Sequence, residues 1–196
     1  MNDNNNEKHA NGFINQCIYD PDLLYDLDCE DFYKKCGIDA NLSSKAIGSK
    51  LKLRPLMLSD YDKGFMKLLS ELTTVGNVSE QQFEKRFFSM KRCKNTYYVT
   101  VIENLETGDI VAAATLVVEE KFIHQASIRG RIEDVVVSAD FRGRKLGHIL
   151  LATLTALGKK LGCYKMSLEC KDELLAWYEN FGYRKDLGNN YMVQRF

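Results

Sequence analysis

The segment 131–161 constrains this chain most, because it joins a short apolar strand to a long apolar helix through a basic loop. A strand is predicted over residues 131–137, where three consecutive valines end the run. Apolar side chains then recur at helical spacing from residue 145 to about residue 161, and Gly162 is a fitting stop for that helix. A unit of this kind predicts an α/β fold, with a mixed central sheet and helices on both faces.

The loop between strand and helix has the chemistry of an anion site. It reads Arg142-Gly143-Arg144-Lys145-Leu146-Gly147. The first N–H groups of a helix lack internal partners, and the helix dipole favours negative charge beside them. Glycines let the backbone approach phosphate oxygens, so we expect a phosphate-bearing ligand. The chain has neither GxxxxGK[ST] nor an early GxGxxG, which argues against the common nucleotide sites. From the loop alone, a helix start with solvated basic side chains remains an alternative.

Together with this strand and helix, the patterns in the remaining sequence predict the order β-α-α-β-β-β-α-β-α-β for the whole domain. A helix is expected after Ser59 as its N-cap, with Phe65, Leu68, Leu69 and Leu72 on one face. A second helix is expected from Ser79, which stands at capping-box spacing from Gln82. The other strands are expected over 51–56, 97–102, 110–118, 164–169 and 191–196, and the last helix over 172–181.

Residues 1–48 are expected to form an N-terminal extension to a domain over 49–196. Residues 1–12 are polar and rich in asparagine, which is typical of disorder. Residues 13–48 mix acids with large apolar groups. Such a segment is either a tail that docks on the domain or a segment that binds a partner, and the first interpretation is preferred.

Composition excludes several classes of protein. Lys+Arg and Asp+Glu are 27 each, and this balance argues against a nucleic-acid-binding protein. No stretch approaches the roughly 20 apolar residues of a membrane-spanning helix, and the N-terminus has no signal-peptide pattern. We therefore expect a soluble, cytoplasmic protein. Its six cysteines form no CxxC pair, so we expect reduced thiols and no metal site.

The basic loop, preceded by Glu133-Asp134-Val135-Val136-Val137, resembles the acetyl-CoA motif of the GNAT N-acetyltransferase superfamily, Arg/Gln-x-x-Gly-x-Gly/Ala. Lys145 departs from it, since glycine is usual there. Five segments in order resemble the glucosamine 6-phosphate N-acetyltransferase family within that superfamily, and residues 19–24 resemble the N-terminal extension of its animal members. The five segments are 72–76, 120–124, 131–137, 162–165 and 191–196.

The resemblance implies the GNAT fold, acetyl-CoA as co-substrate and no metal. It also implies acetyl transfer to the amine of glucosamine 6-phosphate by direct attack, in a homodimer that shares its substrate site between subunits. Catalytic roles are implied for Tyr178, as general acid, and for Glu133 and Asp134. Contacts with acetyl-CoA are implied for Val135, Val137, Arg142, Gly143, Arg144, Lys145, Leu146, Gly147 and Tyr178. Contacts with the amino sugar phosphate are implied for Thr73, Lys121, His124, Glu133, Asp134, Glu169 and Arg195.

Two other functions stay open at this point. One is a GNAT enzyme that acetylates a different amine, such as a polyamine or a protein lysine. The cationic set Lys121, His124 and Arg195 speaks against a polyamine, whose site would be acidic. The other is a non-catalytic acyl-CoA-binding scaffold. Because Glu133 and Asp134 are neighbours on a predicted strand, we expect their side chains to point to opposite faces.

Overall fold

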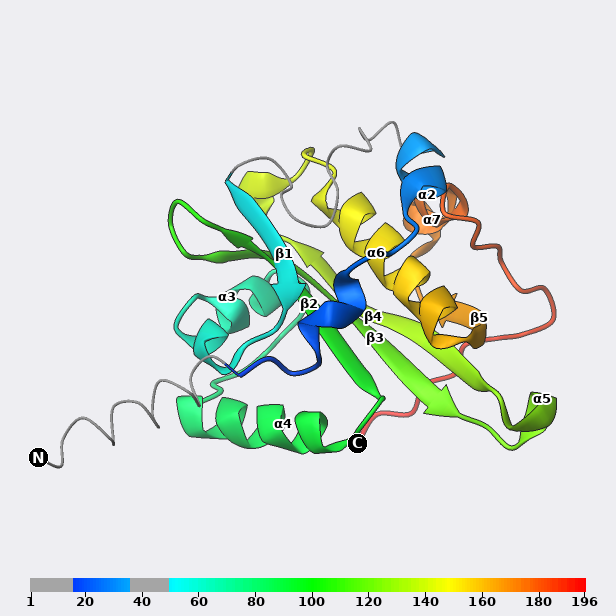
Figure 1. Ribbon diagram of the computed structural model, residues 1–196, viewed down its shortest axis with the longest axis horizontal. Helices are drawn as coiled ribbons and strands as arrows, with labels where there is room; N and C mark the ends of the chain where they lie inside the picture. Colours follow the sequence, from blue (N-terminus) through cyan, green and yellow to red (C-terminus); the bar gives the residue numbers. More distant parts are fainter. Residues whose placement is uncertain (1–15, 36–49) are drawn as a thin grey trace, which may run out of the picture.

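A five-stranded mixed sheet forms the centre of the molecule, in the order β1-β2-β3-β4-β5 (Figure 1). The computed structural model describes residues 16–35 and 50–196; the predicted disorder of residues 1–12 lies outside them. The first three pairings are antiparallel, and β4 pairs with β5 in parallel. The strands are β1 (Leu51–Pro55), β2 (Tyr97–Asn104), β3 (Ile110–Glu120), β4 (Ile128–Val137) and β5 (Cys163–Leu168).

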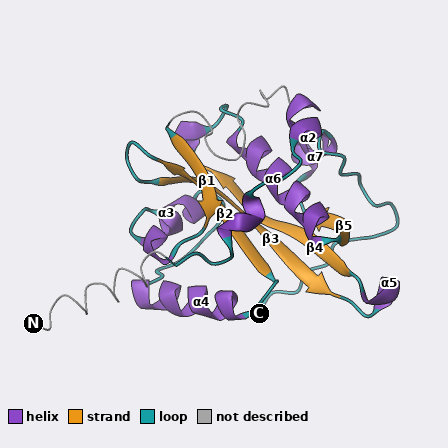
Figure 2. Ribbon diagram, viewed as in Figure 1, coloured by secondary structure: helices purple, strands orange, loops and turns teal. Residues whose placement is uncertain are grey.

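Helices cover both faces of this sheet, which confirms the predicted architecture (Figure 2). The long helix α6 packs in one apolar cluster with β2, β3 and β4. Helices α3 and α4 pack in a second cluster on the other face. No helix in the described part of the chain is long and apolar enough to cross a membrane. The helices are α2 (Glu30–Lys35), α3 (Phe65–Ser70), α4 (Glu80–Arg92), α5 (Ile123–Ala126), α6 (Leu146–Leu161) and α7 (Leu175–Glu179).

Strand β2 shows how the two clusters share one sheet. Tyr98 and Ile102 belong to the cluster under α6, whereas Val99 and Val101 belong to the cluster under α3 and α4. This alternation follows from the two-residue period of a strand. The predicted hairpin is confirmed, since β2 and β3 are antiparallel neighbours joined by a tight turn.

Helix α6 is apolar on most of its surface because it lies between the sheet and the N-terminal segment. Leu150, Leu154 and Leu157 are completely buried, and each contributes about 1.5–3 kcal/mol by leaving water. The helix ends at Gly162, whose φ of 90° is the left-handed C-cap conformation that the sequence predicts. The burial of these leucines fixes α6 on the sheet, and this in turn fixes the position of the basic loop from which the helix starts.

The predicted helix start at Ser59 is wrong. Residues Leu58–Tyr61 form a 3-10 turn, and α3 begins only after Gly64, whose φ is 78°. The side chain of Asp60 accounts for the difference: it accepts hydrogen bonds from the backbone N–H of Met57 at 2.8 Å and from both terminal nitrogens of Arg54 at 2.7 Å. The predicted face also ends early, because Leu72 lies beyond α3 and is exposed.

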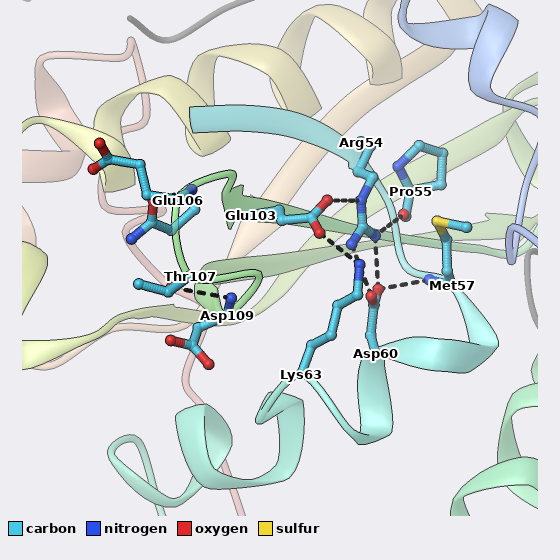
Figure 3. A network of polar contacts seen from close by, with 10 residues as sticks. Arg54, Pro55, Met57, Asp60, Lys63, Glu103, Glu106, Thr107 and Asp109 are labelled. Carbon is cyan, nitrogen blue, oxygen red and sulfur yellow. Dashed lines mark hydrogen bonds and ion pairs between the residues drawn. The ribbon is translucent and has the colours of Figure 1, made fainter. Parts of the chain in front are cut away.

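A buried ion-pair network surrounds this turn (Figure 3). Arg54 on β1 also donates to Glu103 on β2 at 2.8 Å, and Glu103 accepts from Lys63 at 2.5 Å. Because each buried charge has a partner, the network joins β1 and β2 to the segment that leads into α3 without an unpaired ion.

The predicted last strand is also wrong. Residues 191–196 form no strand in the structure, and Met192 and Phe196 are almost fully exposed. An apolar pattern is not enough for a strand, since the backbone needs a neighbour to complete the hydrogen-bond ladder. In this chain the sheet ends at β5, and residues 184–190 lead away from it without regular structure.

The described part of the N-terminal segment docks on the domain. The backbone of Cys17 pairs with that of Met57 in an isolated antiparallel β-bridge, and the Ile18 N–H donates to the carbonyl oxygen of Leu56 at 2.9 Å. Leu24 and Tyr33 are buried in the cluster that contains α6. These apolar side chains belong to the core and are not exposed to a partner.

Candidate active site

Strand β4 carries a bulge at Asp134, which interrupts the regular alternation on which the expectation for Glu133 and Asp134 rests. Val136 pairs with Ala113 and Glu133 with Thr115, which sets two residues of β4 against one of β3. Asp134 has a φ of 53°, the left-handed conformation that accommodates the extra residue. The bulge therefore redirects the strand at the residues predicted to face the substrate.

Strands β4 and β5 stop pairing just before this bulge. Their last paired residues are Ile132 and Leu168. Residues 133–137 of β4 continue without a β5 partner in the described part of the chain. Apart from the carbonyl oxygen of Val137, which accepts from Arg142, backbone polar groups on that edge of β4 can therefore bond to a ligand. Val135 and Val137 lie on this open part, which is where the sequence predicts contacts with acetyl-CoA.

The basic loop lies directly beyond the open part of β4. Arg142 donates from Nε to the carbonyl oxygen of Val137 at 3.3 Å, and Arg144 lies over the ring of Phe141 at 4.6 Å. Lys145 is the N-cap of α6, with a φ of 61°. It adopts the left-handed conformation that glycine adopts most easily, and this explains why a glycine is usual at that position. Leu146 is buried, and a Cβ at Gly147 would lie 3.5 Å from Trp177.

Tyr178 lies on the short helix α7 and is only 7% exposed. Its ring contacts Trp177 at a centroid distance of 4.6 Å and Tyr183 at 6.3 Å. Burial, with smaller contributions from Cys170 and Tyr183, raises the pKa of the phenol to about 12. The hydroxyl is therefore protonated at neutral pH and is available as a proton donor. The helix is shorter than predicted, since residues 172–174 form a 3-10 turn before it.

Arg131 is a site residue that the sequence reasoning missed. It lies on β4 and forms ion pairs with both Glu133 and Glu169. It therefore brings together the carboxylate of Glu133 on β4 and that of Glu169, which directly follows β5. The signal was present in the sequence, because residues 131 and 133 are two apart on a strand and share a face. His148 was also missed, because it belongs to no recognisable sequence motif. In the structure it accepts a hydrogen bond from the indole N–H of Trp177.

The predicted phosphate ligands lie on two separate segments. Lys121 pairs with Glu119, and the ring of His124, which lies in α5, packs on Tyr164 with centroids 4.3 Å apart. Arg195 lies in the exposed C-terminal segment, and the C-terminus lies apart from α5 in Figure 1. No ion pair between described residues joins Arg195 to the α5 region. Thr73, which follows α3, is exposed. Among the described residues, no group of His, Cys, Asp and Glu is placed to hold a metal ion.

Comparisons with known proteins agree with this geometry. The model of the acetyltransferase (GNAT) family matches residues 63–183. A probable glucosamine 6-phosphate N-acetyltransferase of Drosophila melanogaster is 47% identical over 182 residues, covering 91% of this chain and 81% of that protein. The glucosamine 6-phosphate N-acetyltransferase of Arabidopsis thaliana is 38% identical over 131 residues, covering 67% of this chain and 88% of that protein. A crystal structure of the enzyme from Arabidopsis thaliana aligns with a TM-score of 0.72 at 35% identity, covering 76% of this chain and 99% of that chain. The chain therefore belongs to the GNAT acetyltransferase family and, within it, to the glucosamine 6-phosphate N-acetyltransferases.

Proposed function

We propose that this protein transfers the acetyl group of acetyl-CoA directly to the amine of glucosamine 6-phosphate, giving N-acetylglucosamine 6-phosphate and CoA. The observation that carries the proposal is the place where β4 and β5 stop pairing. There the open edge of β4 leads into the basic start of α6. Helix α7, which carries the buried Tyr178, lies beside that start, since a Cβ at Gly147 would lie 3.5 Å from Trp177 and 3.7 Å from Val137. The relatives from Drosophila melanogaster and Arabidopsis thaliana support the choice of acceptor.

The basic loop suits the pyrophosphate of acetyl-CoA. Helix α6 has 16 residues, so its dipole and its unpaired N–H groups favour an anion at its start. Gly143 has a φ of 78° and open space around it, and Arg142 and Arg144 add positive charge. Together with Lys145, Leu146 and Gly147, these residues hold the pyrophosphate, while Val135 and Val137 hold the adjoining part of the molecule through the open edge of β4.

Acetyl-CoA supplies the thioester, and the protein supplies orientation and proton transfer. Backbone N–H groups on the open edge of β4 stabilise the oxyanion that forms when the amine attacks. The attacking amine gives up a proton to a water held by Glu133 and Asp134, and collapse of the tetrahedral intermediate breaks the C–S bond. Tyr178 donates its phenolic proton to the departing sulfur and is reprotonated from solvent; its raised pKa keeps the phenol protonated before the transfer. Glu133, Asp134 and Glu169 hold the amino sugar, and Arg131 fixes two of these carboxylates. Thr73 contacts the sugar from the segment after α3.

A homodimer completes the phosphate site in this proposal. His124 lies in α5 and Lys121 lies two residues before it, whereas Arg195 lies on the exposed C-terminal segment of the same chain. Met192, Val193 and Phe196 are exposed apolar side chains on that segment, and β5 is an edge strand that can accept another strand. The C-terminal segment of a second copy therefore covers this edge and brings the partner's Arg195 to the sugar phosphate.

The location that we propose is the cytoplasm. Cys17, Cys29, Cys93, Cys163 and Cys170 are all free thiols in the structure. Free thiols are usual in a reducing compartment.

An acetylation assay with three acceptors tests the function. Purified protein is given acetyl-CoA with glucosamine 6-phosphate, glucosamine or a histone peptide, and release of free CoA thiol is measured. We expect turnover with glucosamine 6-phosphate and much less with glucosamine, because the cationic side chains recognise the phosphate. Preference for the peptide would favour a protein acetyltransferase. Binding of acetyl-CoA without any turnover would favour a scaffold.

Mixing two impaired variants tests the shared site, with glucosamine 6-phosphate kept well below the raised KM expected for Arg195→Ala. Tyr178→Phe and Arg195→Ala proteins are unfolded together and refolded as a mixture. If each site combines Tyr178 of one subunit with Arg195 of the other, mixed dimers hold one intact site, and the mixture regains roughly a quarter of wild-type activity. Each variant refolded alone is the control. No gain above these controls would place both residues in one subunit's site.

A further inference from the structure

His148 joins the start of α6 to α7 by a hydrogen bond between side chains. The indole N–H of Trp177 donates to Nε2 of His148 at 3.0 Å. The two rings meet edge to face, with centroids 5.1 Å apart and planes at 85°. The imidazole also packs against Phe181, two residues beyond the end of α7, with ring centroids 5.5 Å apart.

This hydrogen bond requires a neutral imidazole. An indole N–H can only donate, so Nε2 of His148 must carry a lone pair and its single proton lies on Nδ1. Burial, and then the charge of Lys145 on the same helix, lower the pKa of His148. Two aromatic rings contact the imidazole of His148, those of Trp177 and Phe181, and neither carries a charge. The neutral form therefore predominates at neutral pH, and acid removes the acceptor.

Helix α7 depends on such contacts because it is short. It has only five residues, and Leu174 at its N-cap makes no side-chain hydrogen bond to it. A helix of this length is held by tertiary packing rather than by its own hydrogen bonds. Trp177 packs edge to face on Tyr178, with ring centroids 4.6 Å apart. A contact that fixes Trp177 therefore also fixes the direction of the Tyr178 phenol.

We propose that His148 is a positioning residue for acetyl transfer: its neutral imidazole holds Trp177 against α6 and so orients Tyr178, and its protonation releases this hold. The role rests on the proposed function, in which Tyr178 donates a proton to the departing sulfur. His148 itself touches neither substrate in this proposal. It acts through Trp177.

The single tryptophan of the chain gives a direct readout that needs no turnover. A protonated imidazole in contact with an indole quenches its fluorescence. We expect the emission of the wild-type protein to fall as the pH is lowered between about pH 8 and pH 5, with a midpoint below that of a free imidazole. His148→Gln should remove this transition. His124→Gln should keep it, since the His124 ring packs on Tyr164 instead.

Kinetics then test the effect on Tyr178. Trp177→Phe keeps an aromatic ring and removes the N–H, and we expect kcat to fall about five- to tenfold while KM for acetyl-CoA changes less than about twofold. His148→Gln places an amide oxygen about where Nε2 lies, so it should keep most of kcat. His148→Asn is too short to reach Trp177 and should lose kcat as Trp177→Phe does. Thermal unfolding of all three variants shows whether each remains folded.

The outcomes separate this proposal from the proposed function. A fluorescence transition that is missing in the wild type, or that persists in His148→Gln, would overturn the titrating contact. Unchanged kcat in Trp177→Phe, or equal kcat in His148→Gln and His148→Asn, would overturn the positioning role. If the fluorescence results hold but the wild type acetylates no amine, the proposed function fails while the contact between His148 and Trp177 stands.

Discussion

The carboxylate oxygen Oε2 of Glu71 lies 3.5 Å from the guanidinium nitrogen Nη2 of Arg142. The same oxygen accepts a hydrogen bond from the backbone N–H of Ala139 at 2.7 Å. Glu71 therefore connects the segment after α3 to the loop before α6. It also offers Arg142 a negative charge, in competition with the pyrophosphate that we propose for this loop.

We predict that Glu71→Gln tightens the binding of acetyl-CoA about two- to fivefold, the range expected for loss of a partly exposed ion pair. The amide oxygen still accepts from Ala139, so the loop keeps its anchor. Titration calorimetry with acetyl-CoA measures the change. Glu71→Ala is the matched control. It should not bind acetyl-CoA more tightly, because the backbone N–H of Ala139 then has no side-chain acceptor and the loop is no longer anchored. Weaker binding in Glu71→Gln would contradict the competition.

Replacing Tyr178 by Phe tests the proton donor. The ring and its packing remain, but the hydroxyl is lost, so we predict that kcat falls by about 100-fold or more. The affinity for acetyl-CoA should change little. Tyr183→Phe is the control, because Tyr183 contacts Tyr178 and its hydroxyl pairs with Thr155 at 3.1 Å. Equal kcat in wild type and Tyr178→Phe would remove this role.

Replacing Arg195 by Ala tests phosphate recognition by the C-terminal segment. A charge-assisted hydrogen bond contributes about 1.5–3 kcal/mol, so we predict that KM for glucosamine 6-phosphate rises about 10- to 100-fold. KM for acetyl-CoA should be unchanged. Steady-state kinetics with each substrate varied in turn give both values. Equal increases in the two KM values would argue for a structural effect instead.

The buried network around Asp60 should contribute strongly to stability. Asp60→Asn leaves Arg54 buried with one fewer partner charge, and we predict a loss of about 3–5 kcal/mol in the free energy of unfolding. Asp62→Asn, two residues away and exposed, should change it by less than about 0.5 kcal/mol. Urea denaturation followed by circular dichroism measures both. Similar values for the two variants would refute the prediction.

Glu103 makes the same network sensitive to acid. Burial raises its pKa, but the hydrogen bonds from Arg54 and Lys63 outweigh burial and leave the pKa below the ordinary value of 4.5. The folded state therefore binds the proton more weakly than the unfolded chain. Its stabilising effect is complete above the unfolded pKa and is lost as the pH falls through the folded pKa. We predict that Glu103→Gln loses less stability than the wild type when urea denaturation is repeated below about pH 4.5.

The regular core of this fold is readable from sequence because local pattern and tertiary environment agree there. The hairpin of β2 and β3, the helix α6 and its stop at Gly162 all follow from periodicity and turn chemistry. The capping box of α4 is also confirmed, with Ser79 and Gln82 bonded reciprocally. The cap of α4 and the stop of α6 are both made by residues close in sequence, which is why the local pattern reveals them.

The wrong predictions share a physical cause, which is a partner distant in sequence. Ser59 does not cap a helix because Asp60 is bound to Arg54 on β1. The regular alternation of β4 is interrupted at Asp134 because β3 pairs with β4 across a bulge there. Residues 191–196 have the pattern of a strand, but no strand of the described residues pairs with them. Arg131 and His148 were missed for a similar reason, since their roles depend on Glu169 and Trp177 from other elements.

The left-handed backbone of Lys145 changes how the acetyl-CoA motif should be written. What this position requires is a positive φ, here 61°, rather than the absence of a side chain. A motif defined by residue type scores Lys145 as a mismatch, whereas one defined by backbone angle scores it as a match. Divergence at this position should therefore follow the tolerance for left-handed geometry, with Gly and Asn accepted readily and the β-branched Val, Ile and Thr selected against.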